Sequence, residues 1–363
     1  MTVGLGGYIT GGGHSLLAPH YGLAIDQVLE LEMVTPKGEI ITANECQNQD
    51  LFWAMRGGGG GTFGVMTSVT VKTYPTPQLV NLNWAITAPA DSPVAWDMIT
   101  YLVSQFPSLA DQEISGYPII FQNQPDPNSG GTKMVTGIMG MVVMINTMNT
   151  ADILKVFQPH FDHINATWPG VFSSWVDPQA YPTLNAWFKD RHDPSPVGYE
   201  HVMSSRLLDT KALTSNLTAT KAALQKFAAG GSATVYIVSG KGVHNAQPRG
   251  GGAAVMPAWR KTYVHATSSA IFVSHNRTAR AEAVNTVGKA SNALKELAPD
   301  MGAYINEGDR FDPEWQKTFW GENYDRLLRI KRDVDPNDVF WCQPCVGHDR
   351  WEEVDDRLCM VSK

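Results

Sequence analysis

Two glycine-rich segments are the most informative chemical feature of this 363-residue chain. They are Gly11-Gly12-Gly13-His14-Ser15 and the five consecutive glycines from Gly57 to Gly61. Glycine loses more backbone entropy on folding than any other residue, so such runs persist where the main chain must approach something closely. Their unshielded N–H groups suit a cofactor's phosphates or ring. We therefore expect the two segments to form a backbone wall against a large, rigid cofactor. For the first segment, a simple glycine-rich turn is the alternative.

The second segment also matches a dinucleotide-binding pattern at Gly59, Gly61 and Gly64. That pattern needs a preceding strand and a following helix. Here a predicted helix precedes the glycines and a predicted strand follows them, which is the reverse order. A nicotinamide-binding unit is therefore not favoured.

Two further motifs do not indicate a reactive site. His160-x-x-His163 falls on a predicted helix end with no third ligand nearby, so a solvated face is favoured and no metal is expected. Cys342-x-x-Cys345 follows Phe340-Trp341 and does not open a helix. Redox dithiols usually lie at a helix N-terminus, so a local disulfide or an inert pair is the preferred interpretation.

The segment around the glycines predicts a small sheet. Residues 28–34 alternate as a strand, residues 39–42 return as its hairpin partner, and residues 63–74 alternate again. A short helix over 51–56, with Asp50 as its N-cap, is expected to end at the second glycine run. Residues 8–10 look strand-like. Pro75 and Pro77 close this block, and a domain boundary is placed there.

The middle of the chain mixes helices and strands. Apolar stripes at helical spacing cover residues 96–106, 213–227 and 284–297, and residues 234–238 and 270–273 look like strands. Irregular alternation of this kind predicts an antiparallel sheet covered by helices. The fold class is thus expected to be α+β.

Near the C-terminus, residues 303–307 predict a short strand with Tyr304 and Asn306 on one face and Ile305 on the other. Residues 323–332 predict a helix that stops before Pro336. Tyr304 is the leading candidate for a catalytic base, and an ordinary half-buried tyrosine is the alternative. A free tyrosine has a pKa of about 10, so this role needs a nearby positive charge or strong hydrogen bonds. Glu307, His265 and Tyr263 are weaker candidates.

Composition narrows the class of protein. A hydrophobic content of 43%, a charged content of 17% and a net charge of -7 describe a folded chain without a basic stripe, so neither nucleic acid nor a membrane is an expected partner. Residues 1–7 do not have the pattern of a signal peptide. Sequons at Asn165, Asn216 and Asn276 nevertheless favour a secreted glycoprotein.

Three segments carry a family resemblance: residues 3–29, residues 50–65 with their glycine run, and residues 304–340 with Tyr304-Ile305-Asn306-Glu307. Together they resemble the berberine-bridge-type FAD-linked oxidases of the vanillyl-alcohol-oxidase superfamily. Details of the last segment resemble fungal branches that include isoamyl-alcohol-oxidase-like proteins. The match is specific at both ends and loose over residues 76–301.

The resemblance implies a domain plan. Residues 1–76 would be the C-terminal part of a PCMH-type FAD-binding domain and residues 77–300 a substrate domain. Residues 301–347 would be a closing module that returns to the FAD domain, followed by a tail over 348–363. In the family a further subdomain precedes Val3, with a pyrophosphate loop and a histidine that often links to the flavin. We expect that subdomain to be missing from this chain and treat it as a candidate partner.

The resemblance also assigns roles. FAD is the implied cofactor, and the residues expected to line it are Gly7, Gly11, Gly12, Gly13, Gly61, Gly64, Val65, Asn306 and Asn323. The implied reaction removes hydride from a small alcohol, sugar or secondary metabolite while a side chain takes the hydroxyl proton, and oxygen is the final acceptor. Tyr304 is our candidate for that side chain, because it shares a predicted strand face with Asn306. The alternative is a non-catalytic remnant or binding module with an incomplete flavin site.

Overall fold

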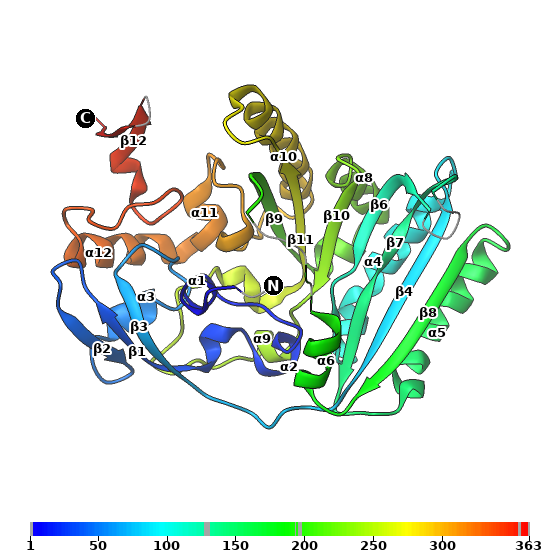
Figure 1. Ribbon diagram of the computed structural model, residues 1–363, viewed down its shortest axis with the longest axis horizontal. Coiled ribbons are helices and arrows are strands. Elements are labelled where there is room, and N and C mark those ends of the chain that lie inside the picture. Colours follow the sequence, from blue (N-terminus) through cyan, green and yellow to red (C-terminus); the bar gives the residue numbers. More distant parts are fainter. Residues whose placement is uncertain (1–2, 127–130, 193, 195–197, 355–356, 362–363) are drawn as a thin grey trace.

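The computed structural model describes residues 3–126, 131–192, 194, 198–354 and 357–361. Figure 1 shows two parts side by side: a small sheet with the C-terminal helices, and a large twisted sheet with helices on one side. The α1 helix (Leu5–Gly11) lies between them. The N-terminal glycines are therefore placed where the two parts meet.

The small sheet has the strand order β2-β1-β3. Its strands are β1 (Val28–Val34), β2 (Ile40–Asn44) and β3 (Val65–Val71), and both pairings are antiparallel. Leu31 and Met33 of β1 are fully buried, as the alternation predicted. The β2–β3 connection carries α3 (Gln49–Ala54), which begins after Asn48, so Asp50 lies in its first turn and is not the N-cap.

The large sheet has eight strands in the order β8-β4-β7-β5-β10-β11-β9, with β6 paired to both β7 and β10. Every pairing is antiparallel, which confirms the predicted α+β class. The strand bounds are β4 (Leu79–Pro89), β5 (Ile114–Gly116), β6 (Ile119–Pro125), β7 (Met134–Ile145), β8 (Ser173–Tyr181), β9 (His201–Asp209), β10 (Ser232–Ile237) and β11 (Thr262–Ile271).

Amphipathic helices cover this sheet (Figure 1). They are α4 (Ala95–Asp111), α5 (Thr150–Thr167), α7 (Thr210–Thr214), α8 (Leu217–Phe227) and α10 (Arg277–Leu297). The stripe predicted over 213–227 is broken into α7 and α8, because the Asn216 side chain caps the second helix by accepting from the N–H of Ala219. The strand expected at 270–273 is the end of the longer β11.

Shorter elements complete the chain. They are α2 (Ala18–Tyr21), α6 (Leu184–Arg191), α9 (Lys241–His244), α11 (Trp315–Trp320), α12 (Tyr324–Val334), β12 (Trp351–Val354) and β13 (Arg357–Met360), with 3-10 turns η1 (Ala24–Gln27), η3 (Pro257–Lys261), η4 (Ile305–Glu307), η5 (Gly321–Asn323) and η6 (His348–Arg350).

Two sequence expectations for local structure are wrong. Residues 8–10 are helical within α1, where the N–H of Tyr8 bonds to the carbonyl of Gly4. Residues 303–307 do not form a strand: Tyr304 is extended, and the N–H of Glu307 then bonds back to the Tyr304 carbonyl to form η4. Both patterns are only three to five residues long, too short for periodicity to separate strand from helical backbone.

Buried polar groups fasten the C-terminal helices to the glycine-rich part. Lys331 of α12 is buried and donates to the carbonyls of Thr62 and Phe340 and to the Asp335 carboxylate, at 2.6–2.8 Å. Cys342 and Cys345 form a disulfide, and Cys342 Sγ lies 3.6 Å from the Gly60 carbonyl oxygen. The C-terminal segment therefore contacts the second glycine run directly.

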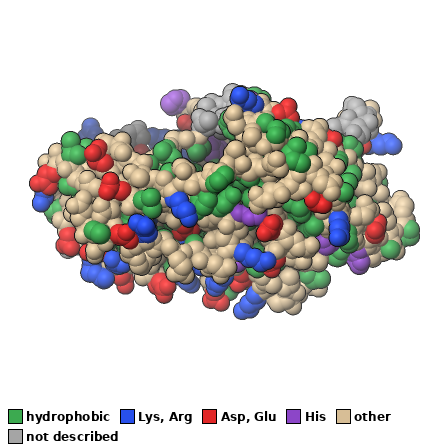
Figure 2. Space-filling view, turned by 90° about the horizontal axis from the view of Figure 1, so that it is seen from below, with side chains coloured by type: hydrophobic (Ala, Val, Ile, Leu, Met, Phe, Trp, Pro, Cys, Tyr) green, Lys and Arg blue, Asp and Glu red, His purple; other side chains and the backbone are tan. Residues whose placement is uncertain are grey.

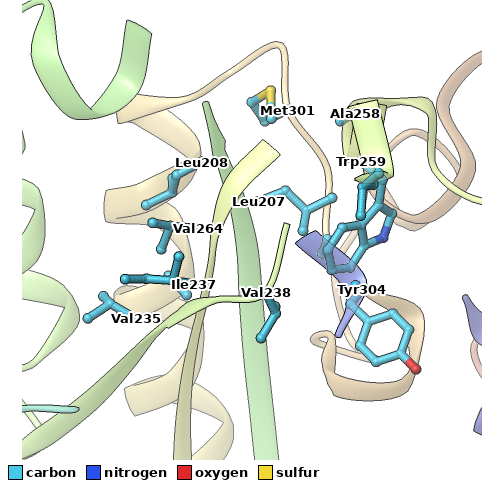
Figure 3. Packing of buried hydrophobic residues seen from close by; sticks show 14 of the residues in the cluster. Leu207, Leu208, Val235, Ile237, Val238, Ala258, Trp259, Val264, Met301 and Tyr304 are labelled. Carbon is cyan, nitrogen blue, oxygen red and sulfur yellow. The ribbon is translucent and has the colours of Figure 1, made fainter. Parts of the chain in front are cut away.

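One large apolar cluster runs through both parts. Figure 3 shows its section near β11, where Val235, Ile237 and Val264 pack together and Trp259 and Tyr304 lie at the opposite end. Acidic and basic side chains are interspersed on the face shown in Figure 2. Among the described helices, none has the length and apolar character needed to span a membrane.

Candidate functional site

The two glycine runs lie against each other. The N–H of Gly59 donates to the Thr10 carbonyl at 2.9 Å. A Cβ placed on Gly60 would lie 3.7 Å from the Cα of Gly7. The proximity expected from the sequence is therefore confirmed, and the wall is made of backbone from α1 and from residues 57–61.

Part of this wall is too close to other protein atoms to carry side chains. A Cβ on Gly11 would meet the Asn306 amide at 2.4 Å, and one on Gly57 would lie 2.2 Å from the backbone nitrogen of Val255. Gly57 also has a φ of +115°, which L side chains rarely adopt. These glycines are required by packing within the protein.

Another part of the wall is open. Gly7 is exposed, and a Cβ added there would meet no atom of the described residues within 4 Å. Gly61 is exposed as well, and its nearest neighbour is the Cys342 sulfur at 3.4 Å. At Gly7 and Gly61 the backbone carries no side chain and is exposed. Such a surface leaves room for a flat ring.

Tyr304 and Asn306 lie at the end of this wall. The Asn306 Nδ2 group donates to the Tyr304 hydroxyl at 2.8 Å and to the Gly7 carbonyl at 2.9 Å. The Tyr304 ring is buried, and its backbone N–H donates to the Ser205 hydroxyl. The sequence thus predicted the pairing of Tyr304 with Asn306, although a 3-10 turn and not a strand produces it.

The electrostatic surroundings of Tyr304 favour the protonated phenol. Burial raises its pKa, the charge of Glu307 raises it further, and the Asn306 hydrogen bond opposes both. The positive charge that would assist Tyr304 as a base at neutral pH does not appear among these influences. Its catalytic role stays a prediction.

Glu307 is the centre of a partly buried polar cluster. One carboxylate oxygen lies 3.1 Å from His14 Nε2 and the other lies 2.9 Å from His265 Nε2. His14 follows α1, His265 lies on β11 and Glu307 ends η4, so the cluster joins three distant parts of the chain. These contacts correspond to hydrogen bonds from two imidazoles to one carboxylate.

The charge on Glu307 determines which nitrogen of each neighbouring imidazole carries a hydrogen. Burial alone would raise the pKa of Glu307, but hydrogen bonds from His14 and His265 hold it well below its ordinary value. An ionised carboxylate only accepts hydrogen bonds, so both Nε2 atoms must carry the proton. Burial also lowers the pKa of His265, which keeps that ring neutral. Both Nδ1 atoms are buried and have no hydrogen-bond partner among the residues that the structure describes.

Aromatic rings surround the cluster. The His14 ring lies 5.2 Å from that of Tyr304 and 6.2 Å from those of Trp259 and Tyr236, between centroids. The three ligand-type atoms of the cluster lie within 4.8 Å of one another, a spacing a metal ion can use. The carboxylate-to-imidazole hydrogen bonds account for the same spacing without an ion.

Other predicted residues lie elsewhere. A Cβ on Gly64 would collide with Met33 and the Val34 carbonyl, and Val65 pairs with Val34 at the start of β3, so both belong to the small sheet. Asn323 donates to the carbonyls of Ala254 and Val255. Tyr263 turns its hydroxyl to Asp111. Gly12 and Gly13 are buried, and Gly12 faces Val255 and the Tyr304 ring.

The sequence interpretation missed three contributors. Val255 packs against both Gly12 and Gly57, Ser205 holds the Tyr304 backbone, and Trp259 is fully buried beside His14. None belongs to a local motif, and only a contact map reveals their placement. His14 follows α1, and its partner Glu307 lies far away in the sequence.

Comparisons with known proteins show which family the chain resembles. A family described as "FAD binding domain" matches residues 1–44, and one described as "Berberine and berberine like" matches residues 303–347. An uncharacterized FAD-linked oxidoreductase of Arthroderma benhamiae is 35% identical over 97% of this chain and 60% of its own length. The FAD-linked oxidoreductase apf9 of Gibberella fujikuroi is 32% identical over 96% of this chain and 60% of its own length. The chain is thus similar at both ends and along its length to berberine-bridge-type FAD-linked oxidoreductases.

Solved structures of flavoproteins are similar to this chain in fold. A VAO-type flavoprotein from Myceliophthora thermophila superposes with a TM-score of 0.89 at 31% identity, covering 98% of this chain and 63% of the other. A berberine bridge enzyme variant superposes with a TM-score of 0.70 at 18% identity, which supports the fold. The chain spans about three fifths of the length of these berberine-bridge-type relatives.

The residues present fit the flavin of this family. The open backbone at Gly7 and Gly61 offers a side-chain-free surface, and Asn306 and Tyr304 provide polar groups at its end. Within the described residues, these groups would hold FAD. Gly11 and Gly57 would support it indirectly by keeping the wall packed.

Proposed function

We propose that this chain is the catalytic part of an FAD-dependent oxidoreductase that oxidises a small alcohol, sugar or secondary metabolite, with oxygen as electron acceptor. The observation that carries the proposal is the open backbone wall at Gly7 and Gly61, which ends at the Tyr304–Asn306 pair. Bound FAD would supply a two-electron acceptor for hydride. The protein's contribution is to bind, orient and manage protons.

In this proposal the wall and the polar pair have separate tasks. Gly7 and Gly61 keep one side free of side chains, so the ring can lie flat. Asn306 bridges the Gly7 carbonyl and the Tyr304 hydroxyl and thereby fixes the hydroxyl relative to the wall. In the proposed reaction Tyr304 receives the proton of a substrate hydroxyl, once a bound partner offsets the influences that raise its pKa.

Flavin binding tests the wall. We expect purified protein to bind FAD, as followed by absorbance and by quenching of flavin fluorescence. Gly7→Leu fills open space and replaces an exposed helical glycine, so it should preserve folding while weakening FAD binding at least tenfold. Gly288→Leu is the matched control, since Gly288 lies in α10 and a Cβ there also meets nothing within 4 Å. Protein that cannot be loaded with FAD would instead support a non-catalytic remnant.

Turnover tests the chemistry. Substrates are screened for anaerobic bleaching of bound flavin and for peroxide release in air. Tyr304→Phe should lower the rate of flavin reduction by a factor of about 10² or more if Tyr304 accepts the proton. An unchanged reduction rate in that variant would remove Tyr304 from the mechanism. Bleaching without peroxide would contradict oxygen as the acceptor.

Secretion and glycosylation belong to the same proposal. The sequon residues Asn165, Asn216 and Asn276 are all exposed, so the sites are accessible to glycosylation. Expression in a fungal secretory host should give protein whose mass falls on treatment with an endoglycosidase. Protein of unmodified mass would contradict this part.

A further inference from the structure

The His14–Glu307–His265 cluster has one open side. The His265 side chain is fully buried and His14 is 11% exposed, whereas the Glu307 side chain is 25% exposed. The histidines therefore close the cluster from within the protein. The carboxylate is the member that a small molecule can reach.

The Glu307 carboxylate can accept further hydrogen bonds. Its two oxygens offer about four lone-pair positions, and the two imidazole N–H groups occupy one on each oxygen. Hydrogen bonds to an ionised acceptor are shorter and stronger than those between neutral groups. Two acceptor positions on one fixed anion thus remain for an incoming donor.

The negative charge is not balanced by a strong cation. Among the ion pairs between described residues, Glu307 is paired only with the two histidines, and no Lys or Arg pairs with it. The titratable groups that influence it or feel its charge are His14, His265 and the phenols of Tyr117, Tyr236 and Tyr304. Burial raises the pKa of each phenol, so these rings stay neutral. A desolvated anion among neutral rings favours a positive or hydrogen-donating ligand.

We propose that Glu307 is the substrate-anchoring residue of this site and that it binds a hydrogen-bond donor, either a hydroxyl or an ammonium group. His14 and His265 are positioning residues, which hold the carboxylate from the protein side through their Nε2–H groups. The inference rests on the proposed function, because it places the anchor close in the chain to Asn306 and Tyr304.

Binding of simple probes tests the anchor without turnover. Benzyl alcohol, benzylammonium and benzoate share one ring and differ in the group offered to Glu307. Ligand-observed NMR on the full chain should show both donors binding and benzoate binding much more weakly. Glu307→Gln should weaken benzylammonium about tenfold or more, which is the weight of one hydrogen bond to a charged group.

Two control variants show whether a loss of probe binding is specific to the Glu307 carboxylate. Glu30→Gln removes another partly buried carboxylate, one that accepts from Asn44, and should leave all three probes unchanged. Glu307→Asp keeps the charge but shortens the side chain, so benzylammonium binding should fall between wild type and Glu307→Gln. A loss confined to benzylammonium identifies an amine substrate, and a parallel loss for benzyl alcohol identifies a hydroxyl. Equal binding of both donors to wild type and Glu307→Gln overturns the inference, as does the absence of binding to wild type.

The positioning role of His14 and His265 can be tested through the tautomers of their imidazole rings. In ¹⁵N-histidine spectra at neutral pH, wild-type His265 should show a protonated Nε2 and an unprotonated Nδ1. In Glu307→Gln one amide oxygen and one NH₂ group face the two rings, so one imidazole should switch to the Nδ1–H tautomer. His244 binds the Thr262 carbonyl and should not change. Unaltered tautomers at both cluster histidines would overturn the positioning role.

The outcomes are independent of the proposed function. Protein that binds the probes through Glu307 but never binds FAD contradicts the oxidoreductase proposal and leaves the anchor in place. Protein that binds FAD and reduces it with equal efficiency in Glu307→Gln, together with unchanged probe binding, retains the oxidoreductase and removes the anchor.

Discussion

The glycine-rich part and the large sheet are held together in opposite ways. Around the glycines, backbone packs on backbone, and buried charges such as Arg56 and Lys331 bond to carbonyl oxygens. In the large sheet, long antiparallel strands present apolar side chains such as Leu82 and Ile138 to the helices. The first part should therefore be intolerant of added atoms and lost charges, and the second of removed methyl groups.

The largest expected effect is at Lys331. Lys331→Met leaves the buried Asp335 carboxylate without its cation and the Thr62 carbonyl without its donor. Breaking a buried ion pair costs about 3–5 kcal/mol of unfolding free energy, which chemical denaturation would measure. The double variant with Asp335→Asn should lose less than the sum of the single variants. Full additivity would show that the pair is not coupled.

A smaller loss is expected from one added methyl group in the glycine wall. Gly57→Ala forces a Cβ against the Val255 backbone at a positive φ, and we expect a loss of about 3 kcal/mol in unfolding free energy. Gly38→Ala is the control, since its φ is +82° but a Cβ there meets nothing within 4 Å. It should cost only about 1 kcal/mol. Equal losses would mean that φ, and not the contact, requires Gly57.

The large sheet should be destabilised by the removal of a methyl group from its core. Ile138→Val removes one methyl group from a fully buried position on β7 and should cost about 1 kcal/mol. Ile40→Val makes the same change on β2, at a side chain that is 71% exposed, and should cost almost nothing. Denaturation midpoints of the two variants and wild type give the comparison. A similar loss at both positions would contradict the packing argument.

The last expected effect is a pH dependence where the two parts meet, and it appears only on acidification. The pKa of His265 is lowered in the folded protein, so the unfolded chain binds a proton first as the pH falls below the ordinary value of 6.5. Stability is then lost on acidification, by at most about 1.4 kcal/mol per pH unit from this group. His265→Gln should flatten that region of the curve. The depressed pKa of Glu307 adds stability above its ordinary value of 4.5, which is lost at lower pH.

The glycine wall could be predicted from the sequence because its signal is local. Five consecutive glycines are rare unless the backbone must approach something closely, and the alternation of Leu31 and Met33 predicts the small sheet. The spacing of Tyr304 and Asn306 also places them together, although η4 is a turn and not the expected strand. The pattern for that strand covers only five residues, too few to separate extended from 3-10 backbone.

The Glu307 cluster could not be predicted in the same way. His14 and Glu307 are 293 positions apart, and His265 and Glu307 are 42 apart. His14 follows α1, His265 lies on β11 and Glu307 ends η4. No sequence spacing relates these three segments, because only folding brings them together. The same applies to Val255, whose backbone dictates Gly57 from a distant part of the sequence.

The polypeptide emerges from the ribosome with its N-terminus first, yet the partners of the first glycines come at the end. Gly11 packs against Asn306, Gly57 packs against Val255, and the Thr62 carbonyl accepts a hydrogen bond from Lys331. During synthesis the early segment stays exposed until residues 255–331 have been translated. Premature termination before residue 300 should therefore yield an aggregation-prone fragment, and chaperone binding to the nascent N-terminal region would be the cellular counterpart of this delay.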